Sequence, residues 1–197
     1  MGTATKVEKF PVIKVKTSLG KPSMKTSFKV KGATLDEVRD NLAKFDHWGE
    51  YTCPLGTKWK TAGKQKNATE VSLTTKPEIA MPVWSNYSKA SKDDKAAWDA
   101  MYAKLLKHEK NHHALALEAI AIFIKEIDDK NSAIDAVNKK IDKETDPKKQ
   151  EKLRDDFDAM TESVLKARLK TLGEDLQKVQ DDYDTKSDHG KKEGVKL

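Results

Sequence analysis

The fold of this chain is limited most by the segment from Lys92 to Asp146, which contains neither glycine nor proline. Ser91 precedes it and Asp93 and Asp94 follow, as expected for the cap and first turn of a helix. Apolar residues then recur at the spacing of one helix face, among them Trp98, Leu105, Ile120, Phe123, Ile127, Ile134 and Ile141. This part of the chain predicts one very long helix, or two in close series.

A second helix is predicted to start at Pro147, because Asp146 can serve as its N-cap and proline is favoured at the first helical position. Apolar residues continue at helical spacing from Leu153 to Tyr183. Since only a short turn separates the two helices, they are expected to form an antiparallel hairpin whose apolar faces pack against each other. Residues 184–197 have no apolar period and are predicted to be a loop.

Residues 1–91 have a different pattern, with β-branched residues, prolines and spaced aromatic residues. Alternating apolar and polar residues predict a first pair of strands at 9–19 and 25–30 and a second pair at 57–62 and 70–75. Thr34 and Glu37 have the spacing of a capping box and predict a short helix between the pairs. The segment 78–84 contains a proline and is predicted to be an edge strand. We therefore expect an α+β fold: a small mixed or antiparallel sheet with one helix, packed on the long helical hairpin.

The charged residues are divided unevenly along the chain. Residues 1–91 carry 16 basic and 8 acidic residues, a net charge of +8, whereas residues 92–197 carry 22 and 24, a net charge of −2. The lysines alternate with apolar residues along the predicted strands and do not cluster with aromatic residues, so the charge does not indicate nucleic-acid binding. No apolar run approaches the length of a membrane span. We expect one domain over residues 1–197, composed of the basic β-rich part, the hairpin at 92–183 and a tail at 184–197.

The predicted long helix contains His108-Glu109-Lys110-Asn111-His112, an H-E-x-x-H motif. Two histidines four positions apart lie on one face of a helix, where both imidazoles can bind one zinc ion. Glu109 lies close enough to take a proton from a water on that metal. Since zinc activates the water and polarises a peptide carbonyl, the motif is typical of zinc metallopeptidases.

A catalytic zinc site needs a third protein ligand. His113 lies about 100° from His112 around the helix, and Glu118 about 240°, so neither can readily join the same metal. His113 is better suited to a supporting contact. The third ligand is therefore expected outside the long helix.

The tail of the hairpin can supply that ligand. About 33 residues, or about 50 Å of helix, separate His112 from the turn, and the same length after Pro147 ends near Gln180. The second helix thus returns level with the metal near Tyr183. His189 can then turn toward the motif, and Asp184 or Asp188 could orient an imidazole.

The two motifs together resemble a bacterial family known as domain of unknown function 922, described as predicted secreted zinc-dependent proteases. That family combines an H-E-x-x-H helix with a downstream Y-D-x-x-T-x-H-G signature. Tyr183, Asp184, His189 and Gly190 match the signature, and Ser187 stands where threonine is usual. The resemblance extends from about residue 15 to residue 194.

This resemblance implies specific roles for residues of the site. His108, His112 and His189 would bind Zn2+ as the cofactor, and Glu109 would act as the catalytic base. It also implies an exported bacterial protein, secreted or periplasmic, whose signal peptide is absent from this sequence.

The function that we expect is hydrolysis of peptide bonds in a peptide or protein substrate by a metal-activated water. Tyr183 and His113 are candidates to stabilise the oxyanion, and the strand at 78–84 is a candidate edge for holding an extended substrate. The alternative is a non-catalytic module in which zinc fastens the tail to the helix and the hairpin binds a protein partner. Binding of an anionic polymer through the basic half is a third hypothesis.

Overall fold

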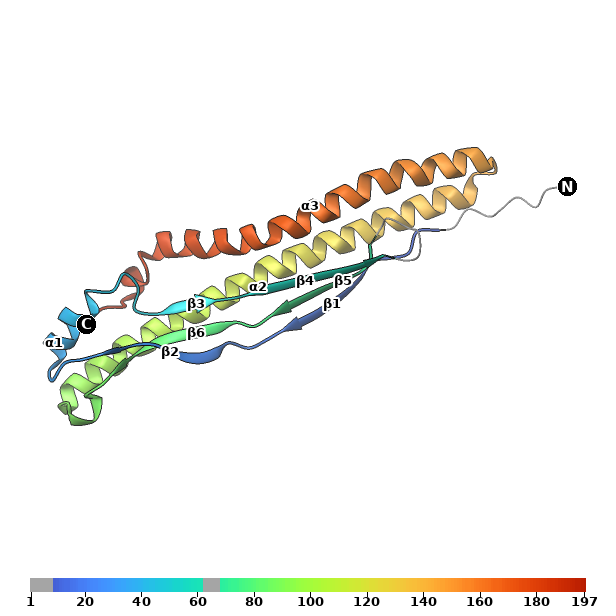
Figure 1. Cartoon of the computed structure of the whole chain (residues 1–197). Helices are drawn as coiled ribbons and strands as arrows, with labels where there is room; N and C mark the ends of the chain where they lie inside the picture. The colour runs from blue at the N-terminus through green and yellow to red at the C-terminus, as the bar shows by residue number, and fades with distance from the viewer. Residues whose placement is uncertain (1–8, 62–67) are drawn as a thin grey trace. The chain divides into compact units, whose positions relative to one another are not determined.

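The computed structural model describes residues 9–61 and 68–197, without the side chains of residues 159–164. The helices of this part of the chain are α1 (Leu35–Leu42), α2 (Lys92–Lys143) and α3 (Pro147–Ser187), with 3₁₀ turns at Tyr87–Lys89 and Lys191–Glu193. The strands are β1 (Lys14–Leu19), β2 (Ser23–Val30), β3 (Glu50–Thr52), β4 (Leu55–Thr61), β5 (Ala68–Thr75) and β6 (Glu78–Trp84). The fold class is α+β, with two small sheets and two long helices (Figure 1).

α2 is a single helix and not two in series. The Ser91 hydroxyl accepts a hydrogen bond from the amide of Asp94 at 3.1 Å, which satisfies one of the unpaired donors of the first turn. The buried residues of α2 lie mostly three or four positions apart, among them Trp98, Met101, Leu105, His108, His112, Ala116, Ile120, Phe123, Ile127, Ile134 and Ile141. Both histidines of the motif therefore belong to the buried face of the helix.

α3 begins at Pro147 as predicted, and the Asp146 carboxylate accepts a hydrogen bond from the amide of Lys148 at 2.9 Å. The helix continues to Ser187, so the prediction of a loop from residue 184 onward is wrong for its first turn. Asp188 and His189 then adopt positive φ values of 52° and 49°, and the His189 amide donates to the Asp184 carbonyl. The positive φ values and this hydrogen bond end the helix after Ser187, so that Asp184 lies in its last turn.

The described chain packs as two compact units. Among the described residues, unit 1 comprises 9–19, 55–61, 68–74 and 120–175, and unit 2 comprises 20–54, 75–119 and 176–197. Each unit combines strands from the first half of the sequence with helical turns from the second. The units therefore do not follow the change in composition near residue 91.

Unit 1 contains a three-stranded sheet in the order β1-β5-β4. β5 is central, with Val71 and Leu73 fully buried, and its pairing with β4 confirms the second predicted strand pair. Residues 62–67 of that prediction lie outside the described residues. In the helical part of unit 1, the Arg168 guanidinium forms an ion pair with Glu126 at 2.7 Å and another with Asp175.

Unit 2 contains the second sheet, in the order β2-β6-β3, with β6 parallel to β2 and antiparallel to β3. The prediction of β6 as an edge strand is wrong, because it is the central strand. Its proline is tolerated because Pro82 lies where the β2–β6 register shifts, beyond the residues that pair with β3. The two edge strands of this sheet are β2 and β3, and the sequence pattern did not predict β3. The first predicted strand pair is also wrong, since β1 and β2 belong to different sheets.

The core of unit 2 joins this sheet and α1 to the first half of α2 (Figure 1). Ile79, Met81 and Trp84 from β6 pack with Trp98, Met101 and Leu105 from α2 and with Val38 and Leu42 from α1. Val195, from the segment after α3, belongs to the same cluster. This core fixes the part of α2 that carries the H-E-x-x-H motif. Among the helices of residues 9–61 and 68–197, none is both long and apolar enough to cross a membrane.

Candidate metal centre

The motif is buried in unit 2. His108, Glu109 and His112 are 3%, 3% and 5% exposed, respectively, on one side of α2. Leu105 precedes them and Ala116 follows them on the same face, and both are buried. Three polar side chains thus interrupt an apolar stripe, which requires that their polar atoms find partners inside the protein.

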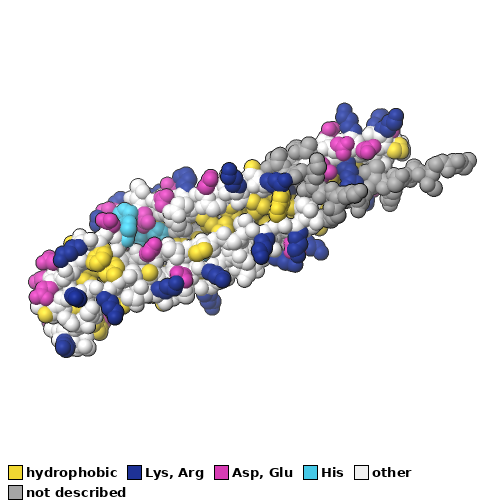
Figure 2. Space-filling model, viewed as in Figure 1, with side chains coloured by type: hydrophobic (Ala, Val, Ile, Leu, Met, Phe, Trp, Pro, Cys, Tyr) yellow, Lys and Arg dark blue, Asp and Glu magenta, His cyan; other side chains and the backbone are white. Residues whose placement is uncertain are grey.

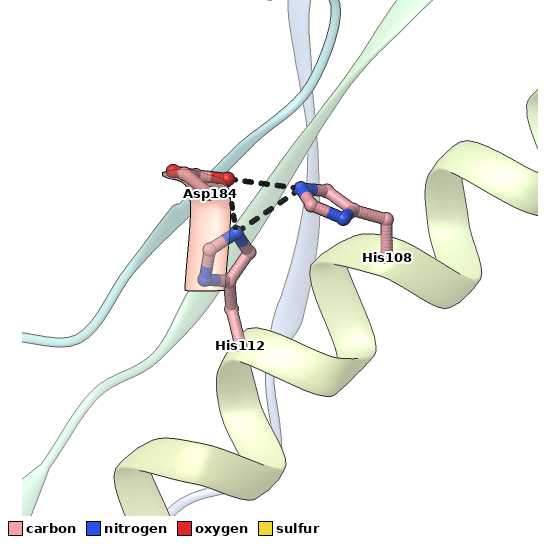
Figure 3. A group of neighbouring side chains, drawn as sticks. All are labelled: His108, His112 and Asp184. Carbon is pink, nitrogen blue, oxygen red and sulfur yellow. Dashed lines mark hydrogen bonds and ion pairs between the residues drawn. The ribbon is translucent and has the colours of Figure 1, made fainter. Parts of the chain in front are cut away.

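Asp184 completes a three-residue group with the two histidines (Figure 3). Its Oδ1 atom lies 3.1 Å from His108 Nε2 and 3.0 Å from His112 Nε2, and the two Nε2 atoms are 3.2 Å apart. The carboxylate comes from the last turn of α3 and the imidazoles from successive turns of α2. Three candidate ligand atoms therefore converge on one point.

The other ring nitrogen of each histidine has its own acceptor. His108 Nδ1 lies 2.9 Å from a carboxylate oxygen of Glu193, and His112 Nδ1 contacts Oε1 of Gln180. The Gln180 side chain is oriented by its own amide group, which donates to the carbonyl of His112 at 3.2 Å. Since both acceptors require a hydrogen on Nδ1, the neutral form of each ring has its lone pair on Nε2.

This arrangement fits a metal ion. Two imidazole lone pairs and a carboxylate oxygen repel one another at about 3 Å unless a cation lies between them. Burial lowers the pKa of His112, although the negative charge of Asp184 acts in the opposite direction. The neutral, ligating form of that ring is therefore favoured. Two histidines and one carboxylate form a ligand set of known catalytic zinc sites.

Glu109 lies next to these ligands and is held in a nearly dry environment. Burial, together with the negative charges of Asp184 and Glu50, raises the pKa of Glu109 to about 8. The segment before β3 closes over this carboxylate at Gly49, where a Cβ atom would lie 2.5 Å from Glu109 Oε1. A side chain at position 49 would therefore displace the Glu109 carboxylate from its present place, whereas glycine lets the backbone lie against it.

Tyr183 packs against both imidazoles. Its ring is stacked on His108 at 4.9 Å between centroids and meets His112 edge-on at 4.8 Å. Its hydroxyl accepts a hydrogen bond from Asn111 at 2.7 Å and donates one to Glu193 at 2.6 Å. Burial is the main reason why the pKa of Tyr183 rises to about 12. The predicted return of the second helix level with the motif near Tyr183 is therefore confirmed.

The remaining predicted site residues lie around this group without joining it. His113 Nδ1 is 3.1 Å from the Tyr51 hydroxyl on β3, so it does make a supporting contact, but with the sheet. The His189 side chain is 49% exposed, with Nδ1 3.9 Å from Asp184 Oδ1 and its ring 5.1 Å from that of His47. Asp188 pairs with Lys191 at 3.5 Å. The structure thus brings together His108, His112 and Asp184, and leaves the role of His189 as a zinc ligand a prediction.

Sequence reasoning did not identify Gln180, Glu193 and Tyr51 as part of the site. The rise per residue of the two helices predicts Gln180 level with His112 but predicts no contact between them. Glu193 lies in a charged tail and Tyr51 in a three-residue strand, and neither has a local pattern that marks it. Figure 2 shows histidine side chains at the surface of the protein with acidic side chains beside them.

Comparison with known proteins gives one match. The model of a family described as "Bacterial protein of unknown function (DUF922)" matches residues 25–162. This range contains the H-E-x-x-H motif and ends before Asp184 and the segment that follows it. Neither the curated proteins nor the solved structures include a match to this chain.

Proposed function

For this chain, which belongs to the bacterial DUF922 family, we propose the function of a zinc-dependent peptidase of zincin-like type. The observation that supports the proposal best is the convergence of His108 Nε2, His112 Nε2 and Asp184 Oδ1 beside the buried carboxylate of Glu109. Without a cation these groups destabilise one another. A buried set of this kind is favoured where a metal and a proton acceptor are needed together.

His108, His112 and Asp184 would hold the metal, with His189 as a further candidate ligand from the turn after α3. When bound at such a ligand set, zinc polarises a carbonyl oxygen and lowers the pKa of a bound water. Zinc is favoured over magnesium or calcium because two of the three ligands are imidazoles.

Glu109 would be the proton acceptor and donor of the reaction. Its pKa of about 8 in the metal-free protein lies close to neutral pH, where a carboxyl group can both take up and release a proton. Positive charge near Asp184 would lower this pKa and so favour the carboxylate, the form that accepts a proton. Gly49 brings the backbone that precedes the edge strand β3 against this side chain.

The test is to remove metal with a chelator, restore zinc, and measure both zinc stoichiometry and cleavage of an unfolded protein such as casein. We expect one zinc per chain and zinc-dependent cleavage, which Glu109→Gln abolishes while zinc stays bound. Glu118→Gln, an exposed position on the same helix, is the matched control. Cleavage that is unchanged in Glu109→Gln, or an absence of stoichiometric zinc, would contradict the proposal.

The same experiment distinguishes a second candidate function, a non-catalytic module in which zinc fastens the end of α3 to α2. This alternative is favoured by the fact that Gln180, Asp184 and Glu193 all reach the motif from α3 or the segment after it. Zinc that is retained without hydrolysis, and whose removal mainly lowers the melting temperature, would support it. Either function is compatible with the secreted or periplasmic location that the family resemblance suggests, which fractionation of a native host would test.

A further inference from the structure

We propose that Glu193 is a positioning residue of the metal centre, which holds the His108 imidazole and the Tyr183 ring in place through one carboxylate. The inference rests on the metal centre of the proposed function and not on peptide hydrolysis. Glu193 lies outside both motifs, in the 3₁₀ turn Lys191–Glu193, and outside the range of the family match.

The two oxygens of Glu193 have different partners. Oε2 lies 2.9 Å from His108 Nδ1, and Oε1 accepts the Tyr183 hydroxyl hydrogen at 2.6 Å. The first contact fixes the hydrogen of His108 on Nδ1, so that Nε2 presents its lone pair toward His112 and Asp184. A carboxylate acceptor also makes the imidazole a better electron donor to a metal than a neutral acceptor would.

The second contact acts through Tyr183. Because its hydroxyl donates to Glu193 and accepts from Asn111, its ring is fixed against the His108 and His112 rings. The hydroxyl hydrogen is occupied by Glu193, which favours a packing role for Tyr183 over stabilisation of an oxyanion. Glu193 thus orients the His108 imidazole directly, and through Tyr183 it fixes the ring that packs against both imidazoles.

The segment after α3 holds Glu193 in this position. Gly190 adopts a φ of 80°, and a Cβ atom there would lie 2.8 Å from Val195 Cγ2 and 3.3 Å from His108 Cγ. Val195 is 5% exposed and belongs to the core of unit 2, and its amide donates to the Gly190 carbonyl at 3.1 Å. Hydrophobic burial of Val195 therefore anchors the turn, and the turn presents Glu193 to His108.

The test compares Glu193→Ala and Glu193→Gln with wild-type protein and with Asp188→Asn, a control that removes a nearby carboxylate paired with Lys191. Zinc affinity is measured by competition with a chelating dye, and the visible spectrum of the Co2+-substituted protein reports the ligand geometry. We expect Glu193→Ala to weaken zinc binding about 10- to 100-fold and to change the Co2+ spectrum. Glu193→Gln should lose less, because its carbonyl oxygen can still accept from His108 Nδ1.

The outcomes separate this inference from the proposed function. If wild-type protein binds zinc and both Glu193 variants bind it as tightly, with an unchanged Co2+ spectrum, only the positioning role is refuted. A loss in Asp188→Asn equal to that in Glu193→Ala refutes it too, because the effect would then follow from the charge of the tail. If the wild-type protein binds no stoichiometric zinc, the metal centre fails and this inference fails with it. Glu193→Gln keeps the side-chain volume, so the comparison holds even if Glu193→Ala folds poorly.

Discussion

Replacing Glu109 by glutamine should stabilise the metal-free protein, although it removes the proposed catalytic base. The wild-type side chain is 3% exposed and lies near the negative charges of Asp184 and Glu50. The ionised form of Glu109 is therefore disfavoured in the folded protein, whereas in the unfolded chain water solvates it without this penalty. Glutamine has nearly the same shape and no charge, so it avoids this penalty.

The size and sign of the effect follow from the pKa of Glu109, which folding raises from 4.5 to about 8. Below pH 4.5 both states are protonated and the penalty is absent. Between pH 4.5 and about 8 the unfolded chain releases the proton while the folded protein keeps it, so wild-type stability falls relative to the variant by at most about 1.4 kcal/mol per pH unit. The ceiling is about 5 kcal/mol, and we expect about 2 kcal/mol at pH 8, because the buried glutamine amide also needs hydrogen-bond partners.

The assay is urea unfolding of both proteins in the presence of a chelator at pH 5, 6.5 and 8. Glu109→Gln should gain stability progressively over wild type as pH rises, whereas Glu118→Gln, at an exposed position of α2, should differ from wild type by less than about 0.5 kcal/mol at every pH. A Glu109→Gln variant that is less stable than wild type at pH 8 would refute the reasoning. So would a stability difference that does not change between pH 5 and pH 8.

Two further substitution pairs test the local packing within the units. Gly190→Ala should lower the stability by about 1–3 kcal/mol, because the φ of 80° at this position is strained for alanine and the new Cβ meets Val195. Gly173→Ala should raise the stability by about 0.5–1 kcal/mol, because this glycine lies in α3 with open space around it. Urea unfolding of both variants tests whether the two effects have opposite signs. Phe123→Ala should lower the stability by about 3–5 kcal/mol, because this α2 side chain is completely buried. Ile122→Ala, at a position that is 54% exposed, should change the stability by about 0.5 kcal/mol or less. Similar melting temperatures for the two variants would contradict the burial of the α2 face that carries Phe123.

The helical part of the fold could be predicted because its causes are local. The caps at Ser91 and Asp146, the absence of glycine and proline between them, and the three- and four-residue spacing of apolar residues all act within a few turns. The hairpin then fixes which residues face each other through the rise per residue alone. For this reason the sequence alone predicts Gln180 level with His112, and in the structure the two side chains are in contact.

The sheets and the third candidate ligand could not be predicted in the same way, because they depend on distant pairing. The proline in β6 indicated an edge, but a shift in register against β2 accommodates it in the central strand. The sequence predicts Asp184 in a loop, as a residue that could orient an imidazole. The helix continues to Ser187 and ends only where Asp188 and His189 adopt positive φ values, so its last turn brings the Asp184 carboxylate itself to the imidazoles.

The position of the motif within α2 is the strongest physical reason to expect a cation at this site. His108 and His112 occupy the stripe of the helix that elsewhere holds buried apolar residues such as Leu105 and Ile120, and Glu109 is buried beside them. Apolar side chains at these positions would avoid the desolvation of two imidazoles and two carboxyl groups, counting Asp184. Hydrogen bonds to Glu193 and Gln180 satisfy the Nδ1 atoms, whereas in the neutral rings the two Nε2 lone pairs face each other and the Asp184 carboxylate, a repulsion that a bound cation would remove. A bound metal would stabilise this group of side chains. Removal of the metal should therefore lower the stability of unit 2, although its apolar core is unchanged.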